Sequence, residues 1–200
     1  MGFVKSQSEA TFYIKETSGN LLVVSIYVDD LLVTGNNEML VGAFKSEILK
    51  AFEMTDLGLV SYFLGMEVQQ RSDGIIIHQR NYAKEILKKF QMEDCKSTDT
   101  PMNQKEKFSK EDGAEKIDEN KYRSLIGCLI YLTSTRPDII FSVSSLSRFM
   151  HCGSELHFQA AKRILRYVKE QQSMASSIHV LTVPSLLDFL IVIGLDLLTI

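Results

Sequence analysis

The feature that most constrains this chain is an apolar run interrupted by two adjacent acidic residues. Residues 21–33 read LLVVSIYVDDLLV, with ten apolar residues in thirteen. Their β-branched and aromatic content favours buried strand over helix, as do the Gly and Asn residues on either side. Asp29 and Asp30 lie where a tight turn between two strands would accommodate them. The run therefore predicts a β-hairpin with a pair of carboxylates at its turn.

Two adjacent carboxylates in apolar surroundings can either hold an ion or form a solvated turn. A buried charge costs several kcal/mol unless it is paired or bound to a metal, and carboxylate oxygens suit Mg²⁺. Neighbouring side chains of a strand point to opposite faces, so Asp29 and Asp30 share one ion only if a turn bends the chain. On spacing alone the preferred interpretation is a solvated turn, because Asp is a common turn residue.

Hydrophobic periodicity predicts a mixed α/β part up to about residue 100. Residues 38–52 show a four-residue apolar step that is typical of a helix, with Leu40, Phe44, Ile48 and Phe52 on one stripe. Residues 59–70 and 75–79 are strand-like and are joined by a turn at 72–74. A short amphipathic helix is predicted at 82–90.

The chain beyond residue 104 has a different pattern. Residues 104–121 hold eleven charged side chains in eighteen, which predicts a linker or an exposed loop. Beyond residue 121 the apolar residues recur with helical spacing, and Pro137 is suited to a first helical turn. Three apolar stripes mark the helices: Tyr122, Leu125, Ile126, Leu129 and Leu132; Ile139, Ile140, Val143, Leu146 and Met150; and Leu156, Ala160, Ala161, Ile164, Leu165 and Val168.

The net charge of −3 conceals an asymmetry along the chain. Residues 1–120 carry a net −6, residues 121–170 carry +5, and residues 171–200 carry −2 with no Lys or Arg. The basic residues of the last predicted helix lie away from its apolar stripe: Lys162, Arg163, Arg166 and Lys169. Two interpretations remain open for this part, a solvated helix face and a surface for nucleic-acid phosphates.

Cysteine usage and the C-terminal composition bear on the cellular environment. Cys95, Cys128 and Cys152 lack metal-ligand spacing, so we expect buried thiols of an intracellular protein that is not secreted. Residues 181–200 are barely long enough to span a bilayer, and Asp188 within them opposes insertion. An ill-packed tail is therefore expected in place of a membrane span.

Several motifs together resemble one known family. Tyr27-Val28-Asp29-Asp30, followed by LLVTGNN, resembles the YxDD motif of reverse transcriptases. Four further stretches are similar to the copia (Ty1/copia) type of long-terminal-repeat retrotransposon polyprotein: FEMTDLGLVSYFLGMEV at 52–68, IHQRNYAKEILKKFQMEDCKSTDTPM at 77–102, YRSLIGCLIYLTSTRPDIIFSVSSLSRFM at 122–150 and HFQAAKRILRYVK at 157–169. The resemblance covers roughly residues 2–169 and keeps the family's motif order, which makes it highly specific.

The resemblance implies an α+β fold. The expected architecture is the C-terminal half of a reverse-transcriptase palm, an antiparallel sheet with helices, followed by a helical thumb-like bundle. Its expected parts are a partial palm at 1–103, a charged linker at 104–121, a thumb-like or connection-like region at 122–170 and an unrelated apolar tail at 171–200.

The resemblance also implies RNA-directed DNA polymerisation by two-metal nucleotidyl transfer. Asp29 would be the direct Mg²⁺ ligand with Asp30 as a weaker neighbour, and Tyr27 and Val28 would lie beside the primer end and the incoming nucleotide. The implied partners are an RNA template, an RNA–DNA or DNA duplex primer and a deoxynucleoside triphosphate.

Two further sets of residues take roles from the resemblance. Phe63, Leu64, Gly65 and Met66 resemble the primer grip, a hairpin that presses the primer terminus toward the metals, and Gly65 would permit close backbone approach. The basic helical part would act as a thumb, with Arg163, Arg166 and Lys169 contacting phosphates of the template–primer duplex.

The chain departs from the family's pattern at both ends. The family's third catalytic Asp lies on an earlier strand, but Glu9 and Glu16 are the acidic residues ahead of Tyr27 and neither lies in such a motif. We therefore expect weak Mg²⁺ binding and no polymerase activity from this chain alone. The resemblance stops after Lys169, where the family continues toward a ribonuclease H domain, so a shifted reading frame or a degraded copy would explain the tail.

Two alternatives to a polymerase fragment stay open at this point. One is a residual nucleic-acid-binding module without catalysis, and the other is a relic without function. In either case the family implies a location in the cytoplasm or nucleus.

Overall fold

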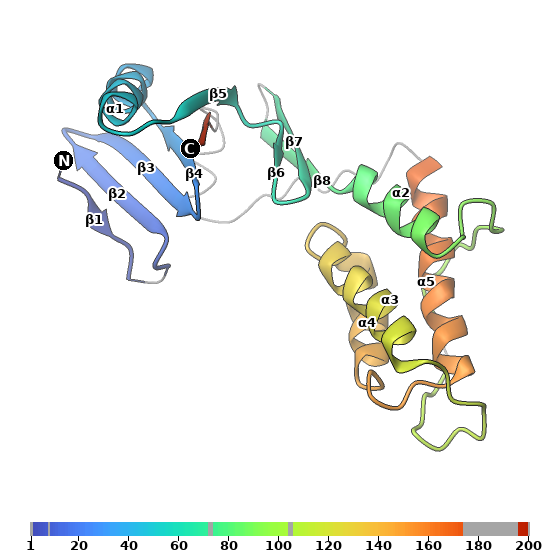
Figure 1. Ribbon diagram of the computed structural model, residues 1–200. Helices are drawn as coiled ribbons and strands as arrows, with labels where there is room; N and C mark the ends of the chain where they lie inside the picture. The colour runs from blue at the N-terminus through green and yellow to red at the C-terminus, as the bar shows by residue number, and fades with distance from the viewer. Residues whose placement is uncertain (1, 8, 72–73, 104–105, 174–195, 200) are drawn as a thin grey trace. The chain divides into compact units, whose positions relative to one another are not determined.

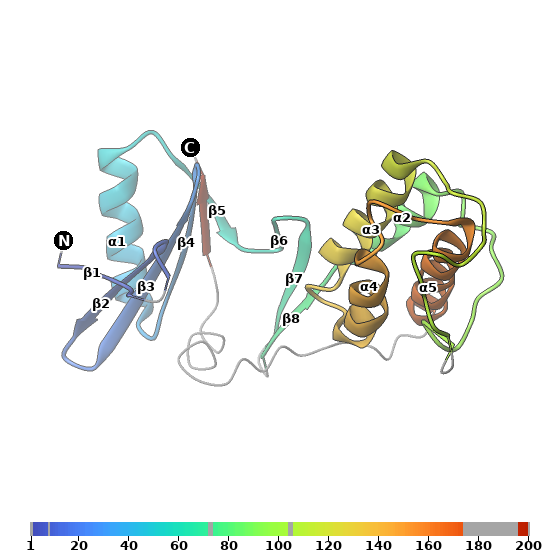
Figure 2. The same cartoon turned by 90° about the horizontal axis from the view of Figure 1, so that it is seen from below.

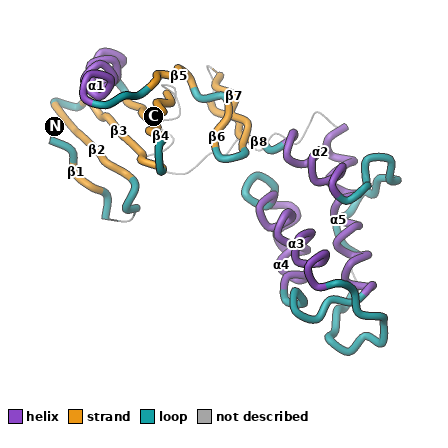
Figure 3. Tube along the Cα trace, in the orientation of Figure 1, coloured by secondary structure: helices purple, strands orange, loops and turns teal. Residues whose placement is uncertain are grey.

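The computed structural model describes the whole chain except residues 1, 8, 72–73, 104–105, 174–195 and 200. The described residues form two compact units (Figure 1). The first unit contains the described residues of 1–77 and of 180–200, and the second contains those of 78–179. Figure 3 shows strands and one helix, α1 (Glu38–Ala51), in the first unit and helices joined by loops in the second.

The first unit is built on a six-stranded sheet in the order β1-β2-β3-β4-β9-β5, with every neighbouring pair antiparallel. Its strands are β1 (Val4–Lys5), β2 (Phe12–Thr17), β3 (Asn20–Tyr27), β4 (Asp30–Gly35), β5 (Thr55–Leu59) and β9 (Asp196–Thr199). Strands β3 and β4 are the two halves of the apolar run, so the predicted hairpin is confirmed. Helix α1 (Glu38–Ala51) lies against one face of this sheet (Figure 2).

Helix α1 follows β4 after a short connection and closes the core of the first unit. Its N-cap is Asn37, whose side-chain oxygen accepts hydrogen bonds from the backbone N–H groups of Met39 and Leu40. Of the predicted stripe, Phe44 and Ile48 are buried against the sheet, whereas Phe52 is the C-cap and is exposed. The core of this unit consists of Leu22, Val24, Val33, Val41, Phe44, Ile48 and Leu198.

The C-terminal strand β9 corrects the expectation of an ill-packed tail for residues 196–199. It pairs with β4 on one side and with β5 on the other, with Leu31 opposite Leu198 and Asp56 opposite Leu198. Leu198 is fully buried. Burial of Leu197 and Leu198 between two strands supplies the packing that the composition by itself did not indicate. The other residues of the apolar stretch 181–200, including Asp188, lie outside the described residues.

A second, three-stranded sheet of the first unit has the order β6-β7-β8, with β6 (Tyr62–Phe63), β7 (Met66–Arg71) and β8 (Gly74–His78). The strand predicted at 59–70 is thus divided by a tight turn. Leu64 and Gly65 form that turn, and both have positive φ, 49° and 74°. Two positive φ values are the pattern of a type I′ turn, in which Gly carries no steric cost.

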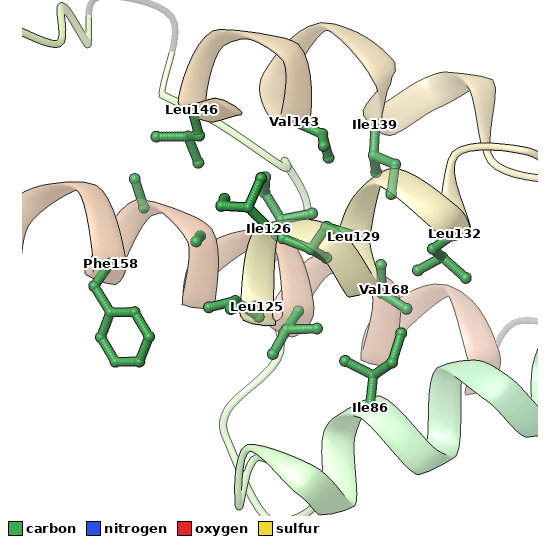
Figure 4. Close-up of a cluster of buried hydrophobic side chains, with 14 of the residues drawn as sticks. Ile86, Leu125, Ile126, Leu129, Leu132, Ile139, Val143, Leu146, Phe158 and Val168 are labelled. Atoms are coloured by element: carbon green, nitrogen blue, oxygen red, sulfur yellow. The ribbon is translucent and has the colours of Figure 1, made fainter. Parts of the chain in front are cut away.

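The second unit is a bundle of α2 (Arg80–Lys89), α3 (Glu119–Leu132), α4 (Ile140–Ser147) and α5 (Glu155–Ser173), with a 3₁₀ turn η1 (Pro137–Ile139) ahead of α4. Figure 4 shows their apolar side chains meeting in one cluster. The five residues of the first predicted stripe are the five buried residues of α3. In the other two stripes Ile140 and Leu156 are exposed, so these stripes are narrower than predicted.

Helix α2 packs with the helices through Ala83, Ile86 and Leu87. The structure therefore changes from strands to helices near residue 78, ahead of the charged segment at 104–121 that was expected to separate them. That segment is mostly irregular in its described part and is anchored by a backbone bridge between Lys116 and Ser154.

Two further observations concern membrane spans and the cysteines. None of the helices in the described part of the chain has the length and hydropathy that a membrane span requires. Cys95, Cys128 and Cys152 are free, as expected, but they are half-buried and not fully buried.

Candidate functional site

The hairpin turn between β3 and β4 holds the first candidate residues. Tyr27 pairs with Asp30 at the last rung of the ladder, so Val28 and Asp29 are the two turn residues. Val28 has φ of 52°. A positive φ at the first turn position is the pattern of a type II′ turn, where Gly is the usual residue, and for a β-branched residue it is a genuine outlier. Backbone strain of this kind costs about 1–3 kcal/mol and concentrates at functional sites.

The turn gives the two carboxylates different positions. Asp29 lies in the turn and is exposed, whereas Asp30 is the first residue of β4 and is half-buried. The hairpin turn thus falls one residue earlier than predicted, because Asp30 is held in the ladder by Tyr27 on one side and Thr199 on the other. Within the described residues neither carboxylate has an ion-pair partner, and no group of three or more His, Cys, Asp or Glu side chains is placed to hold a metal ion.

A cavity of about 600 Å³ adjoins the turn on the side of the sheet that carries α1. Its lining is mainly apolar, and its charged members are Asp29 and Asp30. The remaining lining residues are Gly2, Phe3, Tyr13, Val24, Ile26, Val28, Leu31, Phe44, Ile48, Phe52 and Met54. Asp30 therefore lies between the apolar cavity and the solvent-exposed turn.

The turn at Leu64-Gly65 meets the first hairpin through an aromatic contact. The ring of Phe63 on β6 lies 6.0 Å from the ring of Tyr27, centroid to centroid, with an interplanar angle of 78°. An edge-to-face pair of this kind contributes about 0.5–1.5 kcal/mol beyond the area it buries. The structure therefore brings the YVDD turn and the segment Phe63–Met66 together, although 33 residues separate Asp30 from Phe63.

The three basic residues expected to contact phosphates lie on α5, and each donates a hydrogen bond within the protein. Arg163 Nη2 donates a hydrogen bond to the Thr100 hydroxyl at 2.9 Å. Arg166 Nε donates to the backbone carbonyl of Lys96 at 2.8 Å, and Lys169 Nζ donates to that of Cys95 at 2.7 Å. These cations hold segment 95–100 on the helix, a role that sequence analysis missed because 63 to 74 residues separate the partners.

A buried polar cluster at the start of α5 was also missed. The Ser154 hydroxyl bonds to Asp112 Oδ2 and lies 2.8 Å from Nδ1 of His157, and both Ser154 and His157 are fully buried. Burial lowers the pKa of His157 despite the nearby Asp112, and the hydrogen bond from Ser154 lowers the pKa of Asp112. Phe149 stacks on the imidazole at 4.1 Å. The cluster fastens the segment around Asp112 to the start of α5, and Ser154 within it is closed to solvent.

Comparisons with known proteins identify the family of this chain. The family described as reverse transcriptase (RNA-dependent DNA polymerase) matches residues 1–104. A retrovirus-related Pol polyprotein from transposon RE1 of Arabidopsis thaliana is 37% identical over 168 residues, covering 84% of this chain and 12% of that protein.

Two shorter relatives are also similar. An uncharacterized mitochondrial protein of Arabidopsis thaliana is 40% identical over 144 residues, covering 72% of this chain and 60% of that protein. A transposon Ty5-1 protein of Saccharomyces cerevisiae is 32% identical over 176 residues, covering 87% and 57%. The chain thus spans less than two thirds of each of these relatives. No solved structure matches it.

Proposed function

Because this chain belongs to the reverse transcriptase (RNA-dependent DNA polymerase) family, in its copia type, we propose that its first unit is the metal- and primer-holding part of a polymerase palm. The observation that carries the proposal is the meeting of two hairpins: the strained Val28-Asp29 turn and the Leu64-Gly65 turn, in contact through Tyr27 and Phe63. The substrates would be an RNA template with its primer strand and a deoxynucleoside triphosphate.

The donor atoms at the turn fit Mg²⁺. Asp29 and Asp30 offer oxygen ligands without a competing cation among the described residues, and Mg²⁺ in polymerase sites takes one or two carboxylates plus substrate phosphates. When bound, such ions favour the attacking form of the primer hydroxyl and stabilise the attacking and leaving oxygens. Asp29, which is exposed, would be the direct ligand, and half-buried Asp30 would assist it.

The neighbouring residues would position the primer end. Val28 is 80% exposed and Tyr27 is 46% exposed, so both present apolar surface beside the carboxylates. Leu64 at the second turn is also partly exposed, at 41%. A nucleotide packed on these side chains would lie beside Asp29 and Asp30. The apolar contacts are independent of base identity, as template-directed synthesis requires.

We also propose that the 200-residue chain does not polymerise by itself. Two carboxylates bind Mg²⁺ weakly in the absence of a nucleotide, and loss of one essential member of a catalytic unit commonly costs several orders of magnitude. The third carboxylate would be supplied by polypeptide that is homologous to other parts of the longer Pol relatives.

The test uses Mn²⁺ as a paramagnetic substitute for Mg²⁺, which avoids any dependence on catalysis. In the presence of an RNA–DNA hybrid, Mn²⁺ is expected to broaden the amide resonances around Asp29 and Asp30. Asp29→Ala is expected to abolish the broadening, whereas Asp94→Ala, at an exposed site in the second unit, leaves it unchanged. Broadening centred elsewhere, or unaltered by Asp29→Ala, would refute the metal site.

Primer extension on an RNA template tests the second part of the proposal. The chain alone with Mg²⁺ is expected to incorporate no nucleotide. Incorporation that Asp29→Ala abolishes would show that this chain holds a complete active site.

A second candidate function is binding of duplex nucleic acid without catalysis. It is favoured by the +5 charge of residues 121–170. Salt-dependent binding of an RNA–DNA hybrid, with no Mn²⁺ broadening at the hairpin, would support this function over the first.

A further inference from the structure

Each of the three basic residues on α5 that the sequence suggests as phosphate contacts donates a hydrogen bond to segment 95–100, which directs part of its side chain to the protein. Other cations of the helical unit are therefore candidates for the phosphate contact. Resting on the proposed function, we propose that Lys121 and Lys162, which flank the ring of Phe158, form the contact of this unit with the phosphodiester backbone. Lys121 lies in the first turn of α3, and Lys162 lies one turn after Phe158 on α5.

Both ammonium groups are held against the same aromatic ring. Lys121 Nζ lies 5.0 Å from the Phe158 centroid and Lys162 Nζ lies 4.8 Å from it. The two charges are therefore at most about 10 Å apart, since each lies within 5.0 Å of one centroid. Phe158 is only 3% exposed, so the core of the bundle fixes the ring. Cation–π attraction thus restrains two long side chains before any ligand arrives.

The surrounding acidic groups do not neutralise this pair. Glu119, the nearest Glu on α3, pairs with Arg123 and faces His151. Asp118 caps α3 and accepts the backbone N–H of Lys121 at 2.7 Å. On α5 the acidic residue nearest in sequence is Glu155, which accepts a hydrogen bond from Gln159. Among the described residues neither Lys121 nor Lys162 has an ion-pair partner.

Two ammonium groups within about 10 Å of each other both attract an anion that lies between them. A phosphodiester is always ionised and offers acceptor oxygens, and Lys recognises it as a point charge without reading base identity. The chemistry therefore fits the backbone of a template–primer duplex whatever its sequence. By contrast, Arg163 has its Nη2 on Thr100 and its Nε buried, which leaves less of its guanidinium for a ligand.

The experiment is a salt titration of the affinity of the full chain for a short RNA–DNA hybrid. Each phosphate contact contributes about 0.9 to the slope of log K against log salt. Lys121→Gln combined with Lys162→Gln is therefore expected to reduce the slope by about 1.8, so that between about 50 and 200 mM salt the wild type loses about twelvefold more affinity than the variant. Lys121→Arg with Lys162→Arg is expected to restore the slope.

The matched control removes the same charge from another helix, through Lys84→Gln and Lys88→Gln on the exposed face of α2. It is expected to leave the slope within about 0.5 of the wild type, well under the slope expected from two contacts. Equal slopes for the test and control variants would overturn this inference while the proposed function stands. A wild-type chain that binds no hybrid at all would refute the proposed function, and this inference with it.

Discussion

Glycine-to-alanine substitutions at two positions of the helical unit are expected to change its stability in opposite directions. Gly153 is buried, and a Cβ placed there would lie 2.9 Å from Cδ1 and 3.0 Å from Cγ of Tyr122. Gly127, within α3, has no heavy atom within 4 Å of the corresponding position. The same added methyl group therefore meets a crowded site in one case and open space in the other.

The cost at Gly153 follows from how firmly Tyr122 is held. Its side chain is fully buried, and its hydroxyl donates a hydrogen bond of 2.9 Å to the carbonyl of Leu146. The ring therefore cannot retreat without losing a buried hydrogen bond. Overpacking of this kind costs about 1–3 kcal/mol. Gly127→Ala is instead expected to stabilise α3 by about 0.5–1 kcal/mol, because Ala restricts the unfolded chain and favours helix.

Urea and thermal unfolding monitored by far-UV circular dichroism measure both effects, since α2 to α5 supply most of the helix. For a unit of this size 1 kcal/mol corresponds to about 4–8 °C in the melting temperature. The pair of variants should thus melt on opposite sides of the wild type. A Gly153→Ala protein as stable as the wild type would refute the packing argument, and a destabilised Gly127→Ala protein would refute the assignment of open space.

A double-mutant cycle with Tyr122→Phe tests the mechanism. Without the hydroxyl, the ring is free to shift away from a methyl group at Gly153. We expect Gly153→Ala to cost at least about 0.5 kcal/mol less in the Tyr122→Phe background, a coupling within the range for residues in contact. Strictly additive effects of the two substitutions would mean that residues other than Tyr122 accommodate the added methyl group.

Three further predictions concern other parts of the chain. Burial lowers the pKa of His157, so its stabilising contribution is complete above an ordinary His pKa of about 6.5 and is lost as pH falls below it. NMR titration should give a value below 6.5 for that ring, and one at or above it would contradict the burial argument. Leu198→Ala should destabilise the first unit by about 2–5 kcal/mol, because Leu198 is fully buried between β4 and β5; hydrogen exchange unchanged in β3 and β4 would show that β9 does not belong to the sheet. Val28→Gly should stabilise the first unit by about 1 kcal/mol through release of its positive φ, and a loss of stability in urea unfolding would mean that the turn is unstrained.

Much of the fold follows from local patterns. The apolar run broken at Asp29 predicted the β3–β4 hairpin, and the helical period at residues 122–132 predicted the five side chains that α3 buries. Both predictions depend on the side-chain period of a strand (two residues) or of a helix (3.6 residues). These periods are properties of the local backbone and do not require knowledge of the segment that packs against it. The position of the turn was off by one residue, because the pairing of Asp30 with Tyr27 and Thr199 sets the register.

The sequence by itself thus determined the family, the two classes of secondary structure and the carboxylate pair at a hairpin turn. The tertiary structure decided which side chains meet. It joined Tyr27 to Phe63, placed Leu198 beside Leu31, and directed Arg166 and Lys169 to carbonyls of segment 95–100. The physical reason is that these contacts join residues tens of positions apart, through hydrogen bonds and burial that exist only after the chain has closed on itself. The sequence shows which helix positions carry a Lys or Arg. The groups that each of these side chains contacts are known only from the tertiary structure.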